Sequence, residues 1–349
     1  MKPELDKERG AVLIATLLVM AIMAALTVAL MDDIRLSLKR TANVSDYAQA
    51  DWYVRGAEDY VADVLAQRLQ DVPPEGRNQV LASINPILLP IENGVMQMTV
   101  RDGSHCFNLG SLTTKQGQPN EAAGEQFINT LDALGVSRLQ AEGLRATLTD
   151  WVDADSQAQP GGAEDGDYLR RKPPVLPANT PLASVMEIRA VRGVTPELYE
   201  ALRPWLCIGE SYVETKFNID SAEPWQAPIL AGLIGGADNL PLARQLISER
   251  PEQGYLDMER LTANPLLQDL PQREDEPNIV GLLQNSVIFT PKSLWVELEL
   301  NYRKAQRSRS FHFTGVDNGQ PLLTYRGWGR ESFRPYLRPD DAATASEGR

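Results

Sequence analysis

An uninterrupted apolar segment, Ala11–Met31, constrains this chain more than any other feature of its sequence. It contains no charged residue, and its only polar residues are Thr16 and Thr27. About twenty residues of α-helix, at ~1.5 Å per residue, span the ~30 Å hydrocarbon core of a bilayer. The apolar stretch of a secretory signal is shorter, roughly 7–15 residues, and neither Gly nor Pro ends this one. The segment therefore predicts a membrane-spanning helix that the mature protein keeps.

The helix is expected to continue beyond the membrane. Asp32 and Asp33 mark the exit from the span. Apolar residues then recur at three- and four-residue intervals, an amphipathic helical pattern. These residues are Tyr47, Ala50, Val54, Ala57, Val61 and Leu65. Pro73 and Pro74 would end the helix. The pattern predicts one helix of about 60 residues, half in lipid and half packed on a soluble domain. A plain N-terminal anchor is the alternative.

The flanking charges leave the orientation of the span open. Lys2, Lys7 and Arg9 precede it, and Arg35, Lys39 and Arg40 follow it, so the positive-inside rule favours neither direction. The cysteines add an argument. Cys106 and Cys207 are compatible with one disulfide, which requires an oxidising compartment such as the periplasm. Two unrelated buried thiols are the alternative.

The overall charge and the histidine content limit the possible functions. The formal net charge is −13, which argues against non-specific nucleic-acid binding because that binding needs Lys and Arg to neutralise phosphates. An acidic surface suits divalent cations instead. The histidines are His105 and His312, and this shortage argues against histidine-based catalysis and against a zinc site.

Two regions of the soluble part predict strands. Val95–Val100 has the alternation of a strand, and the block from Ser286 to Gly329 contains further strand-like runs. The region between them has mainly helical spacing. We therefore expect an α+β fold in which strands from both regions form one sheet against the long helix, with a mostly helical insertion. The tail after Pro339 is expected to be disordered.

Two phrases inside the helical region are similar to each other. Phe107-Asn108 returns as Phe217-Asn218, and the serines that follow, Ser111 and Ser221, suit helix N-caps. Farther along, Leu182–Leu206 predicts a helix, a turn and a second helix with Thr195 as its N-cap. This arrangement resembles helix-hairpin-helix units that hold DNA phosphates in other proteins, but the surrounding charge is acidic. We therefore expect no nucleic acid as a partner.

The stretch from Asp150 to Leu169 concentrates acidic residues without any Lys or Arg between them. Its carboxylates belong to Asp150, Asp153, Asp155, Glu164, Asp165 and Asp167. Three glycines allow the chain to turn back, so the carboxylates from both ends can converge. Ca²⁺ accepts six to eight oxygens in a flexible shell, although the spacing is not that of an EF-hand. The alternatives are a solvated acidic loop and a glycosidase-type pair of carboxylates.

The N-terminal pattern of a short polar leader, Gly10, an apolar helix and an amphipathic continuation resembles type IV pilin-like precursors. The resemblance implies that a prepilin peptidase cleaves between Gly10 and Ala11 and that the new N-terminus, Ala11, is methylated. Ala11 departs from the family pattern, in which a bulkier apolar residue is commoner at this position. Most members carry Glu at the fifth mature position, where this chain has Ala15. Loss of that glutamate and the large size are typical of K-type minor pseudopilins of the type II secretion system.

The acidic stretch and the cysteines also resemble the K type. Members of that family carry a D-W-x-D-x-D … G-A-E-D-x-x-Y phrase and bind calcium in the α-domain. The matching residues here are Asp150, Trp151, Asp153, Asp155, Gly162, Ala163, Glu164, Asp165 and Tyr168. Asp167 falls outside the phrase and is not carried over. The resemblance implies structural Ca²⁺ held by Asp150, Asp153, Asp155, Glu164 and Asp165, a Cys106–Cys207 pair, a pilin-like fold with an inserted α-domain, and no catalytic residues.

These expectations divide the chain into six parts. They are a prepilin leader, 1–10; a transmembrane and assembly helix, 11–31; an amphipathic helix with the first part of the pilin-like domain, 32–104; a helical insertion, 105–285; the C-terminal strands, 286–338; and a disordered tail, 339–349.

The resemblance implies a non-enzymatic subunit at the tip of the periplasmic pseudopilus that helps initiate assembly. Ala15 fits the tip, because an isolated carboxylate without a neighbouring amine would be costly in a low-dielectric layer. The implied partners are the minor pseudopilins of the I, J and H types, the major pseudopilin, prepilin peptidase and the bacterial inner membrane. The chain would cross that membrane once, with its globular domain in the periplasm. A membrane-anchored periplasmic hydrolase that uses the acidic loop and a helix-hairpin-helix DNA-binding protein are the alternatives.

Overall fold

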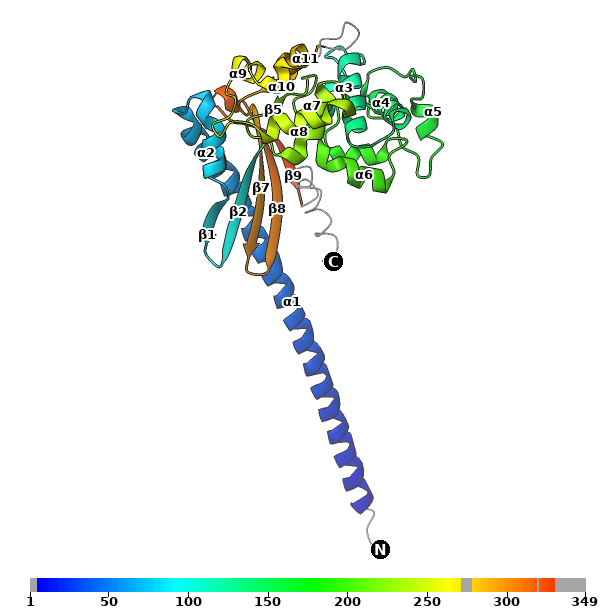
Figure 1. Cartoon of the computed structure of the whole chain (residues 1–349). Helices are drawn as coiled ribbons and strands as arrows, with labels where there is room; N and C mark the ends of the chain where they lie inside the picture. The colour runs from blue at the N-terminus through cyan, green and yellow to red at the C-terminus, as the bar shows by residue number, and fades with distance from the viewer. Residues whose placement is uncertain (1–4, 271–277, 319, 330–349) are drawn as a thin grey trace.

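The computed structural model describes residues 5–270, 278–318 and 320–329. The helix α1 (Leu5–Gln70) forms a rod whose C-terminal part packs against an antiparallel sheet, and a mostly helical domain lies at the end remote from the N-terminus (Figure 1). This arrangement confirms the predicted α+β class and the long helix. The predicted tail, 339–349, and residues 330–338 of the predicted C-terminal strands lie outside the described residues.

The sheet has five antiparallel strands in the order β1-β2-β7-β8-β9. They are β1 (Ile87–Ile91), β2 (Gly94–Asp102), β7 (Ser293–Tyr302), β8 (Ala305–Thr314) and β9 (Leu322–Trp328). In β2 and β7, Asp102 lies opposite Leu294. The whole helical domain is therefore inserted between two strands that are direct neighbours in the sheet.

The amphipathic part of α1 covers one face of this sheet. Ala50, Val54, Val61 and Leu65 are buried against strand residues such as Leu298, because the helical period brings them to a single face. Ion pairs flank this contact. They join Asp46 to Arg303, Asp51 to Arg307 and Glu58 to Arg326. A short helix, α2 (Arg77–Ser83), follows α1 and adds Leu81 to the same core.

The helical domain has a hydrophobic core of its own, separate from the core between α1 and the sheet. Its helices are α3 (Glu121–Ala133), α4 (Arg138–Val152), α5 (Asp165–Tyr168), α6 (Pro196–Leu202), α7 (Ala227–Leu233), α8 (Leu240–Ser248), α9 (Met258–Thr262), α10 (Pro265–Gln268) and α11 (Ile279–Ser286). The helix α3 packs against both α4 and α7. Close approach of α7 depends on Gly232, where a Cβ atom would lie 2.1 Å from Oγ1 of Thr130.

Short elements complete the chain. The 3₁₀ helices are η1 (Pro74–Gly76), η2 (Leu109–Ser111), η3 (Val185–Ala190), η4 (Arg203–Trp205), η5 (Pro224–Gln226), η6 (Ala237–Asn239) and η7 (Val316–Asn318). Two parallel bridges join β3 (Phe107–Asn108) to β4 (Leu206–Cys207) and β5 (Phe217–Asn218) to β6 (Val287–Ile288). The two similar phrases therefore have the same role, which is to begin a two-residue parallel pair.

One local prediction was wrong, and in another the structure specifies the type of helix. Ser111 and Ser221 are not N-caps, because the Asn108 side chain caps η2 and Glu223 occupies the N-cap position of η5. The first helix expected in Leu182–Leu206 is the 3₁₀ helix η3. The second is the α-helix α6, and Thr195 caps it as predicted.

Candidate functional site

The acidic loop joins the end of α4 to α5. Asp153 stands at the C-cap of α4, and Glu164 stands at the N-cap of α5. Among the described residues, Asp153, Asp155 and Glu164 form the group of acids suited to a metal ion, with one oxygen of each within 4.8 Å of the others. The fold thus brings together carboxylates from both ends of the loop.

Two of these three carboxylates are buried without adequate partners. Asp153 is 1% exposed and Glu164 is 7% exposed. Oδ1 of Asp153 and both carboxylate oxygens of Glu164 have no hydrogen-bond partner in the structure as described. Burial, followed by the neighbouring acids, raises the pKa of Asp153 to about 7, and the same causes raise the pKa of Glu164 to about 7. Unpaired buried oxygens are costly, so this donor set fits a hard cation such as Ca²⁺ or Mg²⁺.

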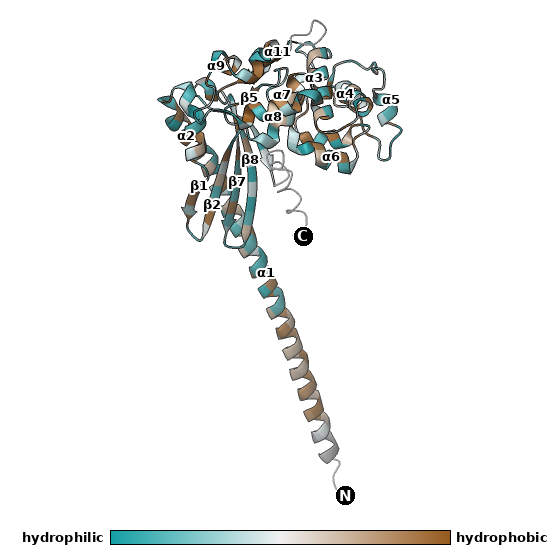
Figure 2. Cartoon of the chain, viewed as in Figure 1, coloured by the Kyte–Doolittle hydropathy of each residue, from teal (hydrophilic) through white to brown (hydrophobic). Residues whose placement is uncertain are grey.

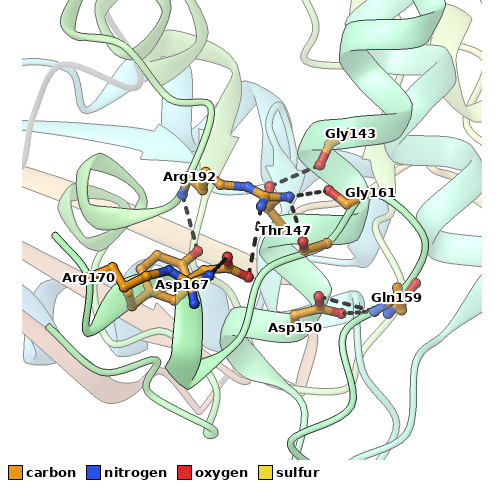
Figure 3. A network of polar contacts seen from close by, with 10 residues as sticks. Gly143, Thr147, Asp150, Gln159, Gly161, Asp167, Arg170 and Arg192 are labelled. Atoms are coloured by element: carbon orange, nitrogen blue, oxygen red, sulfur yellow. Dashed lines mark hydrogen bonds and ion pairs between the residues drawn. The ribbon is translucent and has the colours of Figure 1, made fainter.

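Asp150 fixes the shape of the loop. Its fully buried carboxylate accepts the backbone N–H of Gln159, at 3.2 Å from each oxygen (Figure 3). A Cβ atom at Gly162 would lie 1.8 Å from Oδ2 of Asp150, so this close approach requires glycine. Burial raises the pKa of Asp150. Asp150 lies outside the three-acid group, and so does the half-buried Asp165, although both carboxylates help to raise the pKa of Glu164.

Arg192 holds the loop in place, and the sequence pattern did not single it out. Its Nη2 donates to the carbonyl oxygen of Gly161 at 2.6 Å and to that of Gly162 (Figure 3). Its backbone N–H donates to the Tyr168 hydroxyl at 3.1 Å. Asp167 binds Arg170 at 2.7 Å and approaches Arg192 at 3.9 Å. Asp167 is therefore an ion-pair partner of arginine side chains in this structure.

A disulfide joins Cys106 to Cys207, with a Cα–Cα distance of 5.7 Å. Both residues are buried and pack against Trp295 of β7. Trp295 also contacts the rings of His312 and Tyr325 on β8 and β9. The disulfide therefore closes the base of the helical domain at the point where this domain meets the sheet.

The N-terminal part of α1 is exposed and apolar (Figure 2). Within the described ranges, α1 is the one helix long and apolar enough to cross a membrane. Gly10, Ala11 and Ala15 are exposed on this part of the helix. The helix runs without interruption through Gly10 and Ala11.

Comparison with known proteins identifies two matching family models. Residues 105–210 and 217–280 each match a model described as type II secretion system protein K. The chain is 31% identical over 267 residues to the type II secretion system protein K of Klebsiella pneumoniae, covering 75% of this chain and 81% of that protein. It is also 31% identical over 269 residues to the protein K of Aeromonas hydrophila, covering 74% and 81%.

A solved structure has the same fold. One chain of the GspK–GspI–GspJ complex from the type 2 secretion system of enterotoxigenic Escherichia coli superposes with a TM-score of 0.71 at 26% identity. The superposition covers 83% of the chain described here and 99% of that chain. The superposed part is longer than the helical insertion, residues 105–285, so the similarity extends beyond that domain.

Proposed function

The chain belongs to the type II secretion system protein K family, whose members are minor pseudopilins rather than enzymes, and we propose that it caps the tip of the periplasmic pseudopilus and helps to initiate its assembly. The position of the helical domain is the observation that carries this proposal. It lies at the end of α1 remote from the N-terminus (Figure 1). In a filament whose subunits stack along their long helices, such a domain would block the addition of a subunit above it.

Ala15 supports the same position. It lies on the exposed apolar part of α1, where the pilin-like pattern has a glutamate. A carboxylate in a low-dielectric layer is costly unless a cation pairs with it. A subunit at the tip has no neighbour above to supply an amine, so alanine avoids an unpaired charge there.

Processing and membrane placement are proposed on the basis of membership of the protein K family. We propose cleavage between Gly10 and Ala11, methylation of Ala11, and a single pass through the bacterial inner membrane with the globular part in the periplasm. The Cys106–Cys207 disulfide supports an oxidising compartment. The proposed α-domain is residues 105–285. A hydrophobic core separate from that of the sheet supports a distinct domain, and this core extends to Val287.

The proposed partners are the other minor pseudopilins, of the I and J types and also the H type, together with the major pseudopilin and prepilin peptidase. The GspK–GspI–GspJ complex of the structural relative supports the first two. The outward face of α1 also supports helix-mediated assembly, because Trp52 is 66% exposed on a part of the helix that lies beyond the membrane. We propose no nucleic-acid partner, since the net charge is −13 and Arg192 is engaged with the loop.

We propose that the acidic group holds structural Ca²⁺ through Asp153, Asp155 and Glu164, with Asp150 and Asp165 close by. The ion would neutralise carboxylates that the fold buries and would fix the loop between α4 and α5. The hydrolase alternative is not supported, because the family is a structural component of secretion rather than a family of enzymes.

Removal of the helical domain tests the tip proposal. The domain begins and ends where β2 and β7 are side by side, because the Gly103 N–H donates to the Ser293 carbonyl, one residue beyond the Asp102–Leu294 pair. A two-residue Asn-Gly turn can therefore replace residues 104–292. Such turns suit two-residue hairpins. The variant is co-expressed with the other pseudopilins, its folding is checked by circular dichroism, and its position in isolated filaments is mapped by gold labelling. The proposal predicts incorporation along the shaft. A folded variant found only at filament ends would show that the helical domain is not the block.

A further inference from the structure

The edge strand β1 carries apolar side chains on both of its faces. Ile87–Ile91 reads Ile-Leu-Leu-Pro-Ile. A strand with one solvated face alternates apolar and polar residues, whereas an apolar run is typical of a strand that is covered on both faces. Yet Leu88 is 57% exposed, and Val95 on the neighbouring strand β2 is 44% exposed. The sequence of β1 therefore predicts more burial than the isolated chain provides.

The exposed residues lie on the face of the sheet opposite α1. Leu89 pairs with Met96, which is buried in the core shared with α1. Leu88 and Pro90 alternate with Leu89 and so point to the other face, and Pro90 pairs with Val95. We call Leu88, Pro90 and Val95 the hairpin patch.

The membrane is too distant to cover this patch. At the turn of the β1–β2 hairpin, the Asn93 carbonyl accepts the N–H of Arg303, whose side chain binds Asp46 of α1 at 3.1 Å. The turn therefore lies level with Asp46. From Met31 to Asp46 the helix rises by about 22 Å at ~1.5 Å per residue, whereas the headgroup region extends only about 5–8 Å beyond each side of the hydrocarbon core. The hairpin patch lies farther still from the bilayer.

Strand addition to the edge of β1 is also disfavoured. Pro90 has no N–H to donate, and a proline inside a strand is confined to positions that do not need a ladder bond. Here its nitrogen lies on the side away from β2, because the two-residue turn after Ile91 makes Pro90 and Val95 a non-hydrogen-bonded pair. A partner would therefore contact the side chains of the patch rather than extend the sheet.

The neighbouring part of α1 indicates which partner fits. Between the membrane span and Asp46, α1 is a bare helix with exposed apolar residues, including Leu38 at 65% and Val44 at 69% exposure. The β1–β2 hairpin points along α1 toward this bare segment (Figure 1). A second protein whose own long helix lay along the bare segment would bring its globular domain beside the hairpin.

We propose that the hairpin patch is the docking surface for the globular domain of a second pilin-like subunit, which contacts it through an apolar surface. This inference rests on the proposed association with other minor pseudopilins, and it assigns the contact to a surface outside α1. It explains why β1 is apolar on both faces although it lies at the sheet edge.

The test uses the full-length chain in detergent with full-length I- and J-type pseudopilins. Leu88→Thr/Val95→Thr removes apolar surface and places β-branched threonine, which suits a strand, at both positions. Leu139→Thr on α4 is the control because Leu139 is 81% exposed. The double variant is expected to bind the partners about tenfold more weakly, as loss of one to two apolar contacts implies. The control should bind as the wild type does, and all three proteins should have the same thermal midpoint.

Photo-crosslinking identifies the occupant directly. A benzophenone amino acid at position 88 is expected to crosslink to another pseudopilin in membranes that contain the whole system. Crosslinks only to lipid or to a second copy of this chain would overturn the inference, and so would unchanged affinity of the double variant. If the wild-type chain bound no pseudopilin at all, the proposed function itself would fail, and that result is distinguishable from failure of the patch alone.

Discussion

Glu164 is the residue whose surroundings demand an explanation most clearly. Its side chain is buried, both carboxylate oxygens lack partners within the described residues, and Asp153 is close by. Two carboxylates in such surroundings repel each other unless a cation lies between them. A bound cation would remove this repulsion, and this is the role proposed for Ca²⁺ in the loop.

Replacement of Asp153 by Asn or Glu164 by Gln should remove the response to calcium. For the wild type, Ca²⁺ at a hundred times its dissociation constant should raise the free energy of unfolding by about 2.7 kcal/mol. In chelator, Glu164→Gln should be at least as stable as the wild type, because it removes a buried charge. Thermal unfolding with Ca²⁺ and with chelator measures both effects.

The control is Asp167→Asn, which changes an acid in the same loop that pairs with Arg170. This variant should keep the full calcium response. An equal calcium shift in Asp167→Asn and Glu164→Gln would mean that the ion does not bind at the buried group.

His312 makes the stability depend on pH. Burial lowers its pKa to about 4, while an unfolded histidine titrates near 6.5. The unfolded chain therefore binds a proton between pH 6.5 and 4 that the folded chain does not. The contribution of His312 to stability is complete above pH 6.5 and falls by about 3 kcal/mol as the pH drops to 4. Urea unfolding across this range should show that lowering the pH destabilises the wild type relative to His312→Gln. Parallel curves would contradict the assignment.

Sequence reasoning identified the acids but not how they are held. The sequence has no Lys or Arg between Asp150 and Leu169, so a cluster of carboxylates from both ends of the loop was predictable. The separate role of Asp150 was not, because it depends on a contact with the backbone of Gln159 and on space that only Gly162 leaves. Arg192 was missed because an arginine in a turn has no local pattern that distinguishes it from a solvated one.

At the scale of elements, the packing of α7 on α3 sets the core of the helical domain. A Cβ atom at Gly232 would lie 2.5 Å from Cα of Thr130. Backbone atoms cannot move aside as a flexible side chain can, so α7 would have to shift.

Gly232→Ala should therefore destabilise the domain. Overpacking costs about 1–3 kcal/mol, and this exceeds the gain of roughly 0.5–1 kcal/mol from replacing a helical glycine. Gly143→Ala on α4 is the control, since a Cβ atom there has nothing within 4 Å, and it should be neutral or stabilising. Denaturation midpoints in urea report the difference. Stabilisation by both substitutions would contradict the close contact.

The elements that sequence reasoning predicted best are those with long, regular patterns. The period of apolar residues located α1, and the alternating runs after Ser286 located β7 and β8. The short elements were harder. An asparagine rather than a serine caps η2 because the Asn108 amide also bridges to Gly209 and Glu210, which are distant in sequence.

At the scale of the whole molecule, the disulfide links the two ends of a long segment of the helical domain. Its cysteines are 101 residues apart. In the chain-entropy model, closure of a loop of this length restricts the unfolded chain and stabilises the fold by about 4–5 kcal/mol.

Cys106→Ser/Cys207→Ser should therefore lower the free energy of unfolding by about 2–5 kcal/mol. Calorimetry with and without a reductant measures this effect. Reductant should lower the midpoint of the wild type and leave that of the double variant unchanged. An effect of reductant on the double variant would point to a cause other than this bond.

The global arrangement was predictable because strands occur at both ends of the soluble region with helices between them. The point at which the helical domain is inserted was harder to predict, because no local sequence pattern indicates that β2 and β7 are neighbours. The hydrophobic patterns of β2 and β7 are compatible with many partners, and only the completed sheet selects one.

The position of the chain in the filament tests the central claim most directly. Both native cysteines are in a disulfide, so Leu139→Cys on the exposed surface of α4 gives a thiol for maleimide-gold labelling. Pseudopili assembled from all pseudopilins with this variant are imaged by electron microscopy. A tip subunit predicts one gold particle at one end of each filament, whereas particles distributed along the shaft would contradict the account.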